Sequence, residues 1–146
     1  MTSIGVTGRN ATHDWKRRSE RLVRASGNPY TIVRPGWFDY NDDDQLEITL
    51  LQGDTRHAGS SADGVIARHQ IARVLVDSLA SDAADHLTVE LVAERGPAPD
   101  DLEPIFATLD KDPAGSLDGV RDQTNMPAQA EPERVRRDLI AVAANN

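Results

Sequence analysis

The sequence of 146 residues contains no cysteine, so disulfide bonds and thiolate chemistry are excluded and a reducing compartment suits it. Aromatic residues are scarce, with two each of tryptophan, tyrosine and phenylalanine. The apolar fraction of 38% lies below the roughly 45–50% of an average globular domain. We therefore expect one modest core, built largely from alanine, valine and leucine.

Long apolar runs and an excess of positive charge are also absent. No segment has the apolar length of a signal peptide or a transmembrane helix, so we expect a cytoplasmic protein with no membrane partner. The net charge of −8 argues against nucleic acid as a partner, because a duplex binder carries a basic face. The basic residues gather in Lys16–Arg24 and Arg134–Arg137 at helical spacing, which predicts two solvated helix faces.

The alternation of strand and helix signals predicts an α/β fold. Four segments have the β-branched or alternating apolar content of strands: 1–6, 30–33, 46–51 and 86–93. Two segments have the apolar stripe of an amphipathic helix: 13–26 and 67–79. In the first of these helices, Trp15, Leu22 and Val23 are expected to face the core. The order β-α-β-β-α-β favours a partial Rossmann-like parallel sheet with flanking helices.

The composition changes after Gly96 and becomes rich in proline, aspartate and asparagine. We expect residues 1–96 to form an incomplete Rossmann-like domain and residues 97–146 a helical, partly irregular tail. Within the tail, a short helical pattern covers 102–109 and a last helix is expected at 132–144. The tail either packs on the sheet or is partly disordered.

Gly5–Ala11 has the Gly-x-x-Gly-x-x-Ala spacing with which a turn presents helix N–H groups to a pyrophosphate. The helix that follows is highly charged, however, and no acidic residue closes the next strand to hold a ribose hydroxyl. Arg34 stands there instead, which would suit a 2′-phosphate. The stretch is therefore either a dinucleotide loop or a plain strand-to-helix loop, and we favour the second.

No metal site is expected from the sequence. The histidines lie far apart without supporting carboxylates: His13, His57, His69 and His86. Asp42–Asp44 lacks the ligand ladder and closing glutamate of a calcium loop, which predicts a solvated acidic loop.

The segment Trp15–Phe38, WKRRSERLVRASGNPYTIVRPGWF, resembles a helix and the following strand of an atypical short-chain dehydrogenase/reductase of the NAD(P)H-binding, NmrA-like branch. The resemblance extends from Ser3 to Glu94. It includes the stretch from Gly64, GVIARHQIARVL, which is similar to the helix start of that family. The resemblance implies the carboxyl-terminal, substrate-side part of such an enzyme, lacking most of the dinucleotide-binding half and inactive alone. We expect Arg68 to bond the preceding loop.

The same resemblance assigns the candidate site. Lys16 stands where the family lysine contacts the nicotinamide ribose, and Ser3 stands near the place of the family serine, so these two are the catalytic candidates. Thr12 occupies the place of the family tyrosine, which removes the usual proton donor. The cofactor-binding candidates are Lys16, Arg34, Pro35, Gly36 and Trp37, with NAD or NADP as the implied cofactor. A solvated role for Lys16 and a plain turn at Pro35 remain as alternatives.

Three functions follow from these observations. The first is hydride transfer between a nicotinamide cofactor and a small carbonyl or alcohol substrate. The second is a non-catalytic NmrA-like module that senses dinucleotide or binds a partner protein. The third is self-association, because an uncovered sheet edge favours a homodimer.

Overall fold

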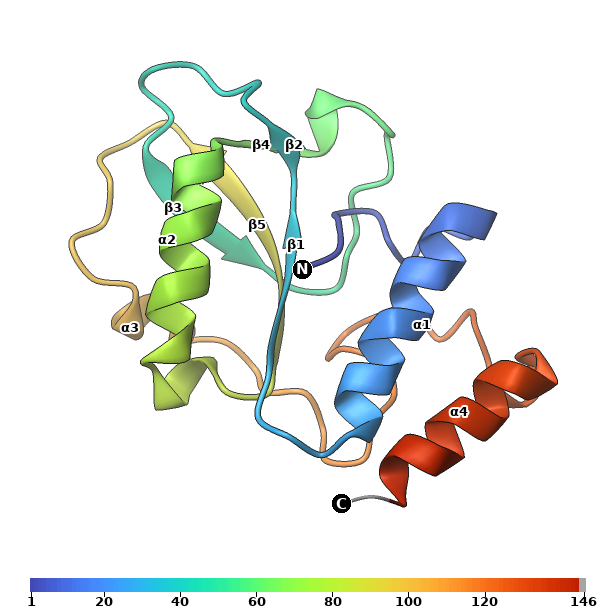
Figure 1. The fold of residues 1–146 in the computed structure, drawn as a ribbon. Coiled ribbons are helices and arrows are strands. Elements are labelled where there is room, and N and C mark those ends of the chain that lie inside the picture. The colour runs from blue at the N-terminus through green and yellow to red at the C-terminus, as the bar shows by residue number, and fades with distance from the viewer. Residues whose placement is uncertain (145–146) are drawn as a thin grey trace.

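The computed structural model describes residues 1–144 and shows an α/β fold around a three-stranded sheet (Figure 1). Strands β1 (Thr31–Pro35), β5 (Leu87–Glu94) and β3 (Glu47–Leu51) lie in the order β1-β5-β3. Strand β1 runs parallel to β5, whereas β3 runs antiparallel to it. Strands β2 (Trp37–Phe38) and β4 (Val65–Ile66) form a separate parallel pair.

The expected partial Rossmann-like α/β class is confirmed, with one strand reversed. The connection 39–46 between β2 and β3 contains no helix. Parallel strands need a crossover of a dozen or more residues, so a chain that turns back through this short loop enters the sheet antiparallel. The sheet is therefore mixed rather than wholly parallel.

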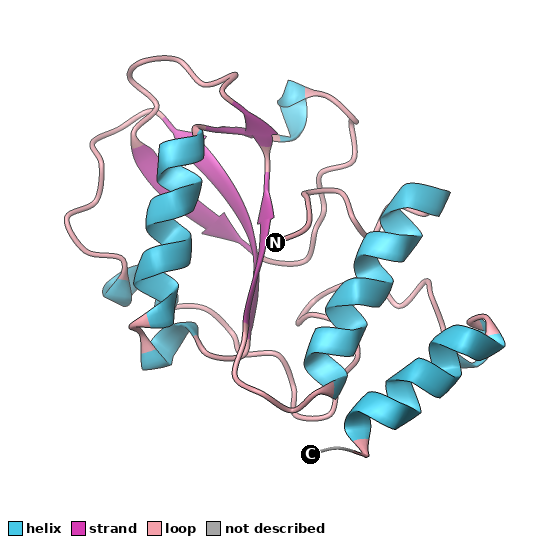
Figure 2. Cartoon of the chain, viewed as in Figure 1, coloured by secondary structure: helices cyan, strands magenta, loops and turns pink. Residues whose placement is uncertain are grey.

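Helices cover both faces of the sheet (Figure 2). The four α-helices are α1 (Ala11–Ala25), α2 (Arg68–Leu79), α3 (Glu103–Phe106) and α4 (Glu133–Ala143). Short 3₁₀ turns occupy Ser61–Asp63, Asp82–Ala84 and Ala128–Ala130. Each predicted helix is confirmed, including the short one within 102–109. None of the helices within residues 1–144 is long and apolar enough to cross a bilayer.

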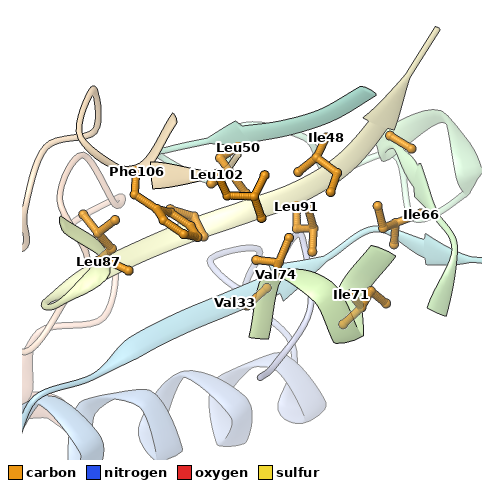
Figure 3. Close-up of a cluster of buried hydrophobic side chains, with 13 residues drawn as sticks. Val33, Ile48, Leu50, Ile66, Ile71, Val74, Leu87, Leu91, Leu102 and Phe106 are labelled. Carbon is orange, nitrogen blue, oxygen red and sulfur yellow. The ribbon is translucent and has the colours of Figure 1, made fainter. Parts of the chain in front are cut away.

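The hydrophobic core lies between α2 and one face of the sheet (Figure 3). Alternate residues of a strand point to opposite faces, and Leu87, Val89 and Leu91 of β5 all point to this one. Ile71 and Val74 of α2 pack against them. Two residues from beyond position 96, Leu102 and Phe106, complete the same core.

The opposite face of the sheet is polar and lies under α1. Arg34 of β1 and Glu90 of β5 are both buried there, with exposed fractions of 0% and 2%. Arg34 bonds Glu20 of α1, and Thr88 of β5 accepts a hydrogen bond from Arg24 of α1. Charged and polar side chains thus fill the space between the sheet and α1.

The predicted orientation of α1 is wrong. Its buried side chains are Arg17, Glu20, Arg21 and Arg24, whereas Trp15 is 48% exposed and Val23 is 43% exposed. The buried arginines form ion pairs with carboxylates of other segments, so the charged face of α1 is the face that points into the protein. The expectation of a solvated face for Lys16–Arg24 is therefore corrected, while Arg134, Arg136 and Arg137 are exposed as predicted.

The start of the tail packs on the sheet through Leu102 and Phe106, whereas its later part packs on α1, which the sequence did not predict. Arg21 is the centre of this contact: it pairs with Asp118 at 2.8 Å and with Glu131 at 3.0 Å, and it donates to the Met126 carbonyl at 2.6 Å. Val135 and Leu139 of α4 are buried beside it. Figure 1 shows α4 lying alongside α1, away from the sheet.

Residues 1–6 do not form the predicted strand, although they lie along the edge of β1. The amides of Thr2 and Ile4 donate to the carbonyls of Val33 and Pro35 at 2.9 and 3.0 Å. In a parallel ladder the return bonds would come from the amides of Pro35 and Trp37. Proline has no N–H, and the Trp37 amide donates to Gly64 instead, so the ladder stays one-sided.

Candidate functional site

A cavity of about 820 Å³ opens at the carboxyl end of β1. Five parts of the chain line it: the segment 1–8, the start of α1, residues 35–40 around β2, the loop 57–63 and the start of α2 at Arg68. In a parallel sheet the carboxyl ends of strands are where ligands bind, and the volume falls in the range of small-molecule sites. This cavity is therefore the candidate site.

Lys16 and Ser3 meet in the cavity wall. The Lys16 ammonium donates a hydrogen bond to the Ser3 hydroxyl at 2.9 Å, and both side chains are half-buried. Lys16 comes from the first turns of α1, whereas Ser3 comes from the segment held along β1. Folding thus joins a cationic donor and a hydroxyl at one point of the cavity.

Pro35, Gly36 and Trp37 line the same cavity. A Cβ on Gly36 would lie 2.5 Å from the carbonyl oxygen of Gly64, so only glycine lets the chain pass from β1 into β2 at this distance. The Trp37 ring is 40% exposed and meets Tyr40 edge to face, with ring centroids 6.1 Å apart. The two rings give the cavity an apolar surface on which a flat ligand can lie.

Arg34 does not line the cavity, so its predicted cofactor contact is wrong. Its guanidinium bonds Glu20 at 2.7 Å, Asp122 at 2.7 Å and Glu90 at 3.3 Å, and the residue is fully buried. Consecutive residues of a strand point to opposite faces, which sends Arg34 under α1. The carboxylates that hold it come from distant positions that no local pattern connects to it.

Burial of this ionic layer alters the chemistry of one carboxyl. Burial raises the pKa of Glu90 to about 7, the nearby Arg34 guanidinium opposes that rise, and the Asp54 carboxylate adds to it. Asp122 shows the reverse behaviour: burial acts to raise its pKa, but the hydrogen bonds from Arg34 and the positive charges of Arg34 and Arg24 together lower it. Glu90 is therefore the carboxyl of this layer that changes charge near neutral pH.

The turn at Gly5–Ala11 holds a carboxylate of the same chain. The amides of Gly5 and Thr7 donate to the two carboxylate oxygens of Asp54, each at 2.6 Å, and Asp54 is fully buried. The Gly8 amide closes the turn onto the Gly5 carbonyl. With its amides engaged in this way, the turn offers no nest for a pyrophosphate. It precedes α1 as predicted, although no strand comes before it.

Several cavity residues were not predicted as site residues from the sequence. These are His13, His57, Tyr40, Asp63 and Arg68. Arg68 pairs with Asp39 and lies over the Phe38 ring, so it bonds the loop after β2 rather than the loop directly before it. Within residues 1–144 no three His, Asp or Glu side chains lie grouped as a metal ion requires.

Comparison with known proteins assigns the family. The sequence profile of the NAD(P)H-binding family matches residues 5–82, which is more than half of the chain. The chain belongs to the NAD(P)H-binding family. The resemblance noted from Ser3 to Glu94 is thereby confirmed at the level of the family.

Three plant proteins are similar to this NAD(P)H-binding chain. An uncharacterized chloroplastic protein of Arabidopsis thaliana is 31% identical over 94 residues, covering 64% of this chain and 31% of that protein. The chloroplastic protein TIC 62 of Pisum sativum is 34% identical over 84 residues, covering 55% of this chain and 15% of that protein. Sanguinarine reductase of Eschscholzia californica is 28% identical over 98 residues, covering 65% of this chain and 35% of that protein. The chain thus spans about a third or less of the length of each of these relatives.

The residues of the cavity fit one end of an NAD(P)H molecule. The Lys16 ammonium and Ser3 hydroxyl, 2.9 Å apart, offer donors for ribose hydroxyls, and the Trp37 ring offers a surface for a planar ring. The Gly5–Thr7 amides, which would have to hold the pyrophosphate, are already bonded to Asp54. The fit is therefore to the nicotinamide end and not to the pyrophosphate.

Proposed function

We propose that this chain forms the nicotinamide- and substrate-side part of an atypical NAD(P)-dependent short-chain dehydrogenase/reductase. The reaction is hydride transfer between the nicotinamide and a small carbonyl or alcohol compound. The observation that carries the proposal is the shared cavity, which Lys16, Ser3, Pro35 and Trp37 all line. The reductase name of one relative points in the same direction.

Four of the cavity residues have assigned roles in this proposal. The Lys16 ammonium, oriented by Ser3, binds the nicotinamide ribose hydroxyls through charge-assisted hydrogen bonds. Pro35 and Trp37 bind the ring on its apolar face and exclude water from that side. The cofactor, when bound, supplies the hydride, and the protein supplies position and a dry surface.

Tryptophan fluorescence tests binding directly, because the two tryptophans have different places. Trp37 lines the cavity, whereas Trp15 lies outside it, stacked between the guanidinium groups of Arg18 and Arg134 at 4.5 and 5.4 Å. NADPH and NADH are each titrated into the wild type, Trp15→Phe and Trp37→Phe. Binding at the cavity quenches the wild type and Trp15→Phe but leaves the emission of Trp37→Phe unchanged.

A matched pair of lysine variants tests the assigned contact. The sequence has two lysines, and the second, Lys111, is exposed, lies outside the cavity and donates a hydrogen bond to the Asp82 carbonyl at 3.1 Å. Lys16→Met removes donors to the ribose and is expected to weaken cofactor binding about tenfold to a hundredfold, from a loss of roughly 1.5–3 kcal/mol. Lys111→Met leaves affinity unchanged. Equal affinities for both variants, or no fluorescence change up to millimolar cofactor, overturn the proposal.

The second candidate is a non-catalytic, NmrA-like module that binds dinucleotide and a partner protein. The observation in its favour is Thr12, which stands at the place of the family tyrosine, is exposed and does not line the cavity. Cofactor binding without oxidation of NADPH in the presence of carbonyl compounds would favour this candidate. Cytoplasmic location stays a prediction, and two of the relatives are named as chloroplastic.

Self-association stays a prediction as well. Thr2 and Ile4 bond the outer edge of β1, and the strand order leaves β3 at the other edge. We propose that any homodimer forms at one of these sheet edges. Light scattering on the purified chain measures its mass, and a monomer at all concentrations excludes the dimer.

A further inference from the structure

The cavity contains a group that can replace the missing tyrosine. Thr12 stands four residues before Lys16, at the place of the family tyrosine. It is exposed and does not line the cavity. The next residue, His13, does line the cavity. His13 and Lys16 are three residues apart on α1, which places them on the same side of the helix, one turn apart.

We propose that His13 is the catalytic residue that protonates the substrate carbonyl oxygen in this chain. This inference rests on the proposed function, because it assumes that the cavity binds the nicotinamide and the substrate together. It goes further by assigning the proton transfer to a residue outside the Tyr-x-x-x-Lys pattern.

The His13 ring is held in one orientation by the backbone. Its Nδ1 lies 3.1 Å from the carbonyl oxygen of Gly8. A carbonyl oxygen can only accept, so Nδ1 carries the hydrogen and Nε2 is the nitrogen that gains and loses a proton. The carbon between the two nitrogens lies 3.8 Å from the point where a Cβ would stand on Gly5, another residue of the cavity wall. Among the described residues, none hydrogen bonds to Nε2.

Four other side chains of the cavity that could carry a proton are less suited to this step. Tyr40 is 66% exposed and packs edge to face on Trp37, and none of the described residues fixes its hydroxyl by a hydrogen bond. Asp63 accepts hydrogen bonds from the amides of Ala58 and Gly59 at 2.6 and 2.8 Å. Arg68 is paired with Asp39, and a guanidinium does not release its proton. His57 lines the cavity too, but it lies on an exposed loop and no hydrogen bond fixes its ring among the described residues. His13 alone combines a place in the wall, a fixed tautomer and a position beside Lys16.

The proton and electron balance of the step is complete. The reductant is a reduced nicotinamide dinucleotide. The carbonyl carbon would accept a hydride ion from it, that is, one proton together with two electrons. The carbonyl π electrons move to the oxygen, which takes the proton from Nε2 of the His13 imidazolium. The products are an alcohol, an oxidised nicotinamide and a neutral imidazole that keeps its Nδ1 hydrogen. Solvent returns the proton to Nε2.

The test uses the full chain with NADPH and three carbonyl probes: 4-nitrobenzaldehyde, 9,10-phenanthrenequinone and pyruvate. His13→Ala is expected to lower kcat about a hundredfold or more, while its affinity for NADPH changes by no more than about twofold. Added imidazole restores part of the rate of His13→Ala. His13→Gln, whose side-chain amide can still donate to the Gly8 carbonyl, is as slow as His13→Ala. His69→Ala, at an exposed histidine outside the cavity, is the matched control and keeps the wild-type rate.

Nitrogen NMR of the histidine rings gives a reading that does not depend on turnover. We expect His13 to show a hydrogen on Nδ1, and its Nε2 resonance to shift on addition of NADPH while that of His86, outside the cavity, stays in place. A hydrogen-free Nδ1, or a His13→Gln variant with full activity, overturns the inference. NADPH binding without reduction of any probe overturns it too and leaves the binding proposal standing. Absence of NADPH binding overturns both.

Discussion

Replacement of Glu90 by glutamine is expected to abolish a fall in stability between about pH 5 and about pH 8. Burial raises the pKa of this carboxyl from 4.5 to about 7, and the Arg34 guanidinium opposes that rise only in part. The folded chain therefore holds the Glu90 proton more tightly than the unfolded chain does. The resulting stabilisation is complete below the unfolded value of 4.5 and is lost as the pH rises through about 7.

The size of the effect follows from the shift. A rise from 4.5 to about 7 corresponds to about 3 kcal/mol of unfolding free energy, at about 1.4 kcal/mol for each pH unit. Glu90 is 2% exposed, so solvent does little to reduce this figure. Asp122 acts in the opposite direction, because its lowered pKa gives stability that is lost only as the pH falls below its ordinary range.

The assay is urea unfolding followed by tryptophan fluorescence at a series of pH values from about 5 to about 8. Wild type and Glu90→Gln are compared at each pH, so the titration of the histidines cancels in the difference. The difference should approach 3 kcal/mol over this range, to order of magnitude. Glu133→Gln, which changes an exposed glutamate, serves as control and should follow the wild type. Parallel curves for Glu90→Gln and wild type would refute the link between burial and proton binding at this site.

Three further substitutions test the layers around the cavity. Arg21→Leu removes one of the two arginine partners of Glu131 and of Asp118, which keep Arg18 and Arg17, and should lower the unfolding free energy by about 1.5–3 kcal/mol. Arg95→Leu breaks only exposed pairs and should cost about 0–1 kcal/mol; comparable losses in urea unfolding would contradict this. Asp54→Asn removes the charge that binds two amides of the turn, and hydrogen exchange of those amides should accelerate by at least about tenfold; unchanged exchange would show that the clamp is unimportant. Gly36→Ala places a Cβ 2.5 Å from the Gly64 carbonyl and should destabilise by about 1–3 kcal/mol, measured as a lower Tm. An unchanged Tm would mean that β2 and β4 separate freely.

Local chemistry made the framework predictable. The strands near 30–33, 46–51 and 86–93 are confirmed because β-branched residues in alternating or continuous apolar runs suit only a sheet. The turn at Pro35 and Gly36 could be placed at the end of β1, because a Pro-Gly pair interrupts a strand. Strand β2 was not predicted. The resemblance around Trp15–Phe38 led to the family, which the match over residues 5–82 confirms.

The tertiary structure alone decided which face of α1 is inside and what the site contains. Helical periodicity shows that a helix has two faces, but burial of the charged one depends on carboxylates at Asp118 and Glu131, which lie about a hundred residues along the chain. The hydrogen bonds from the Gly5 turn to Asp54 also join distant positions, so no local pattern predicts them. The position of His13 in the cavity wall likewise depends on segments that come together only in the folded chain. Hydrophobic patterning is local and can be seen in one segment. Ion pairs and cavity walls depend on contacts between distant segments, which exist only once the chain has folded.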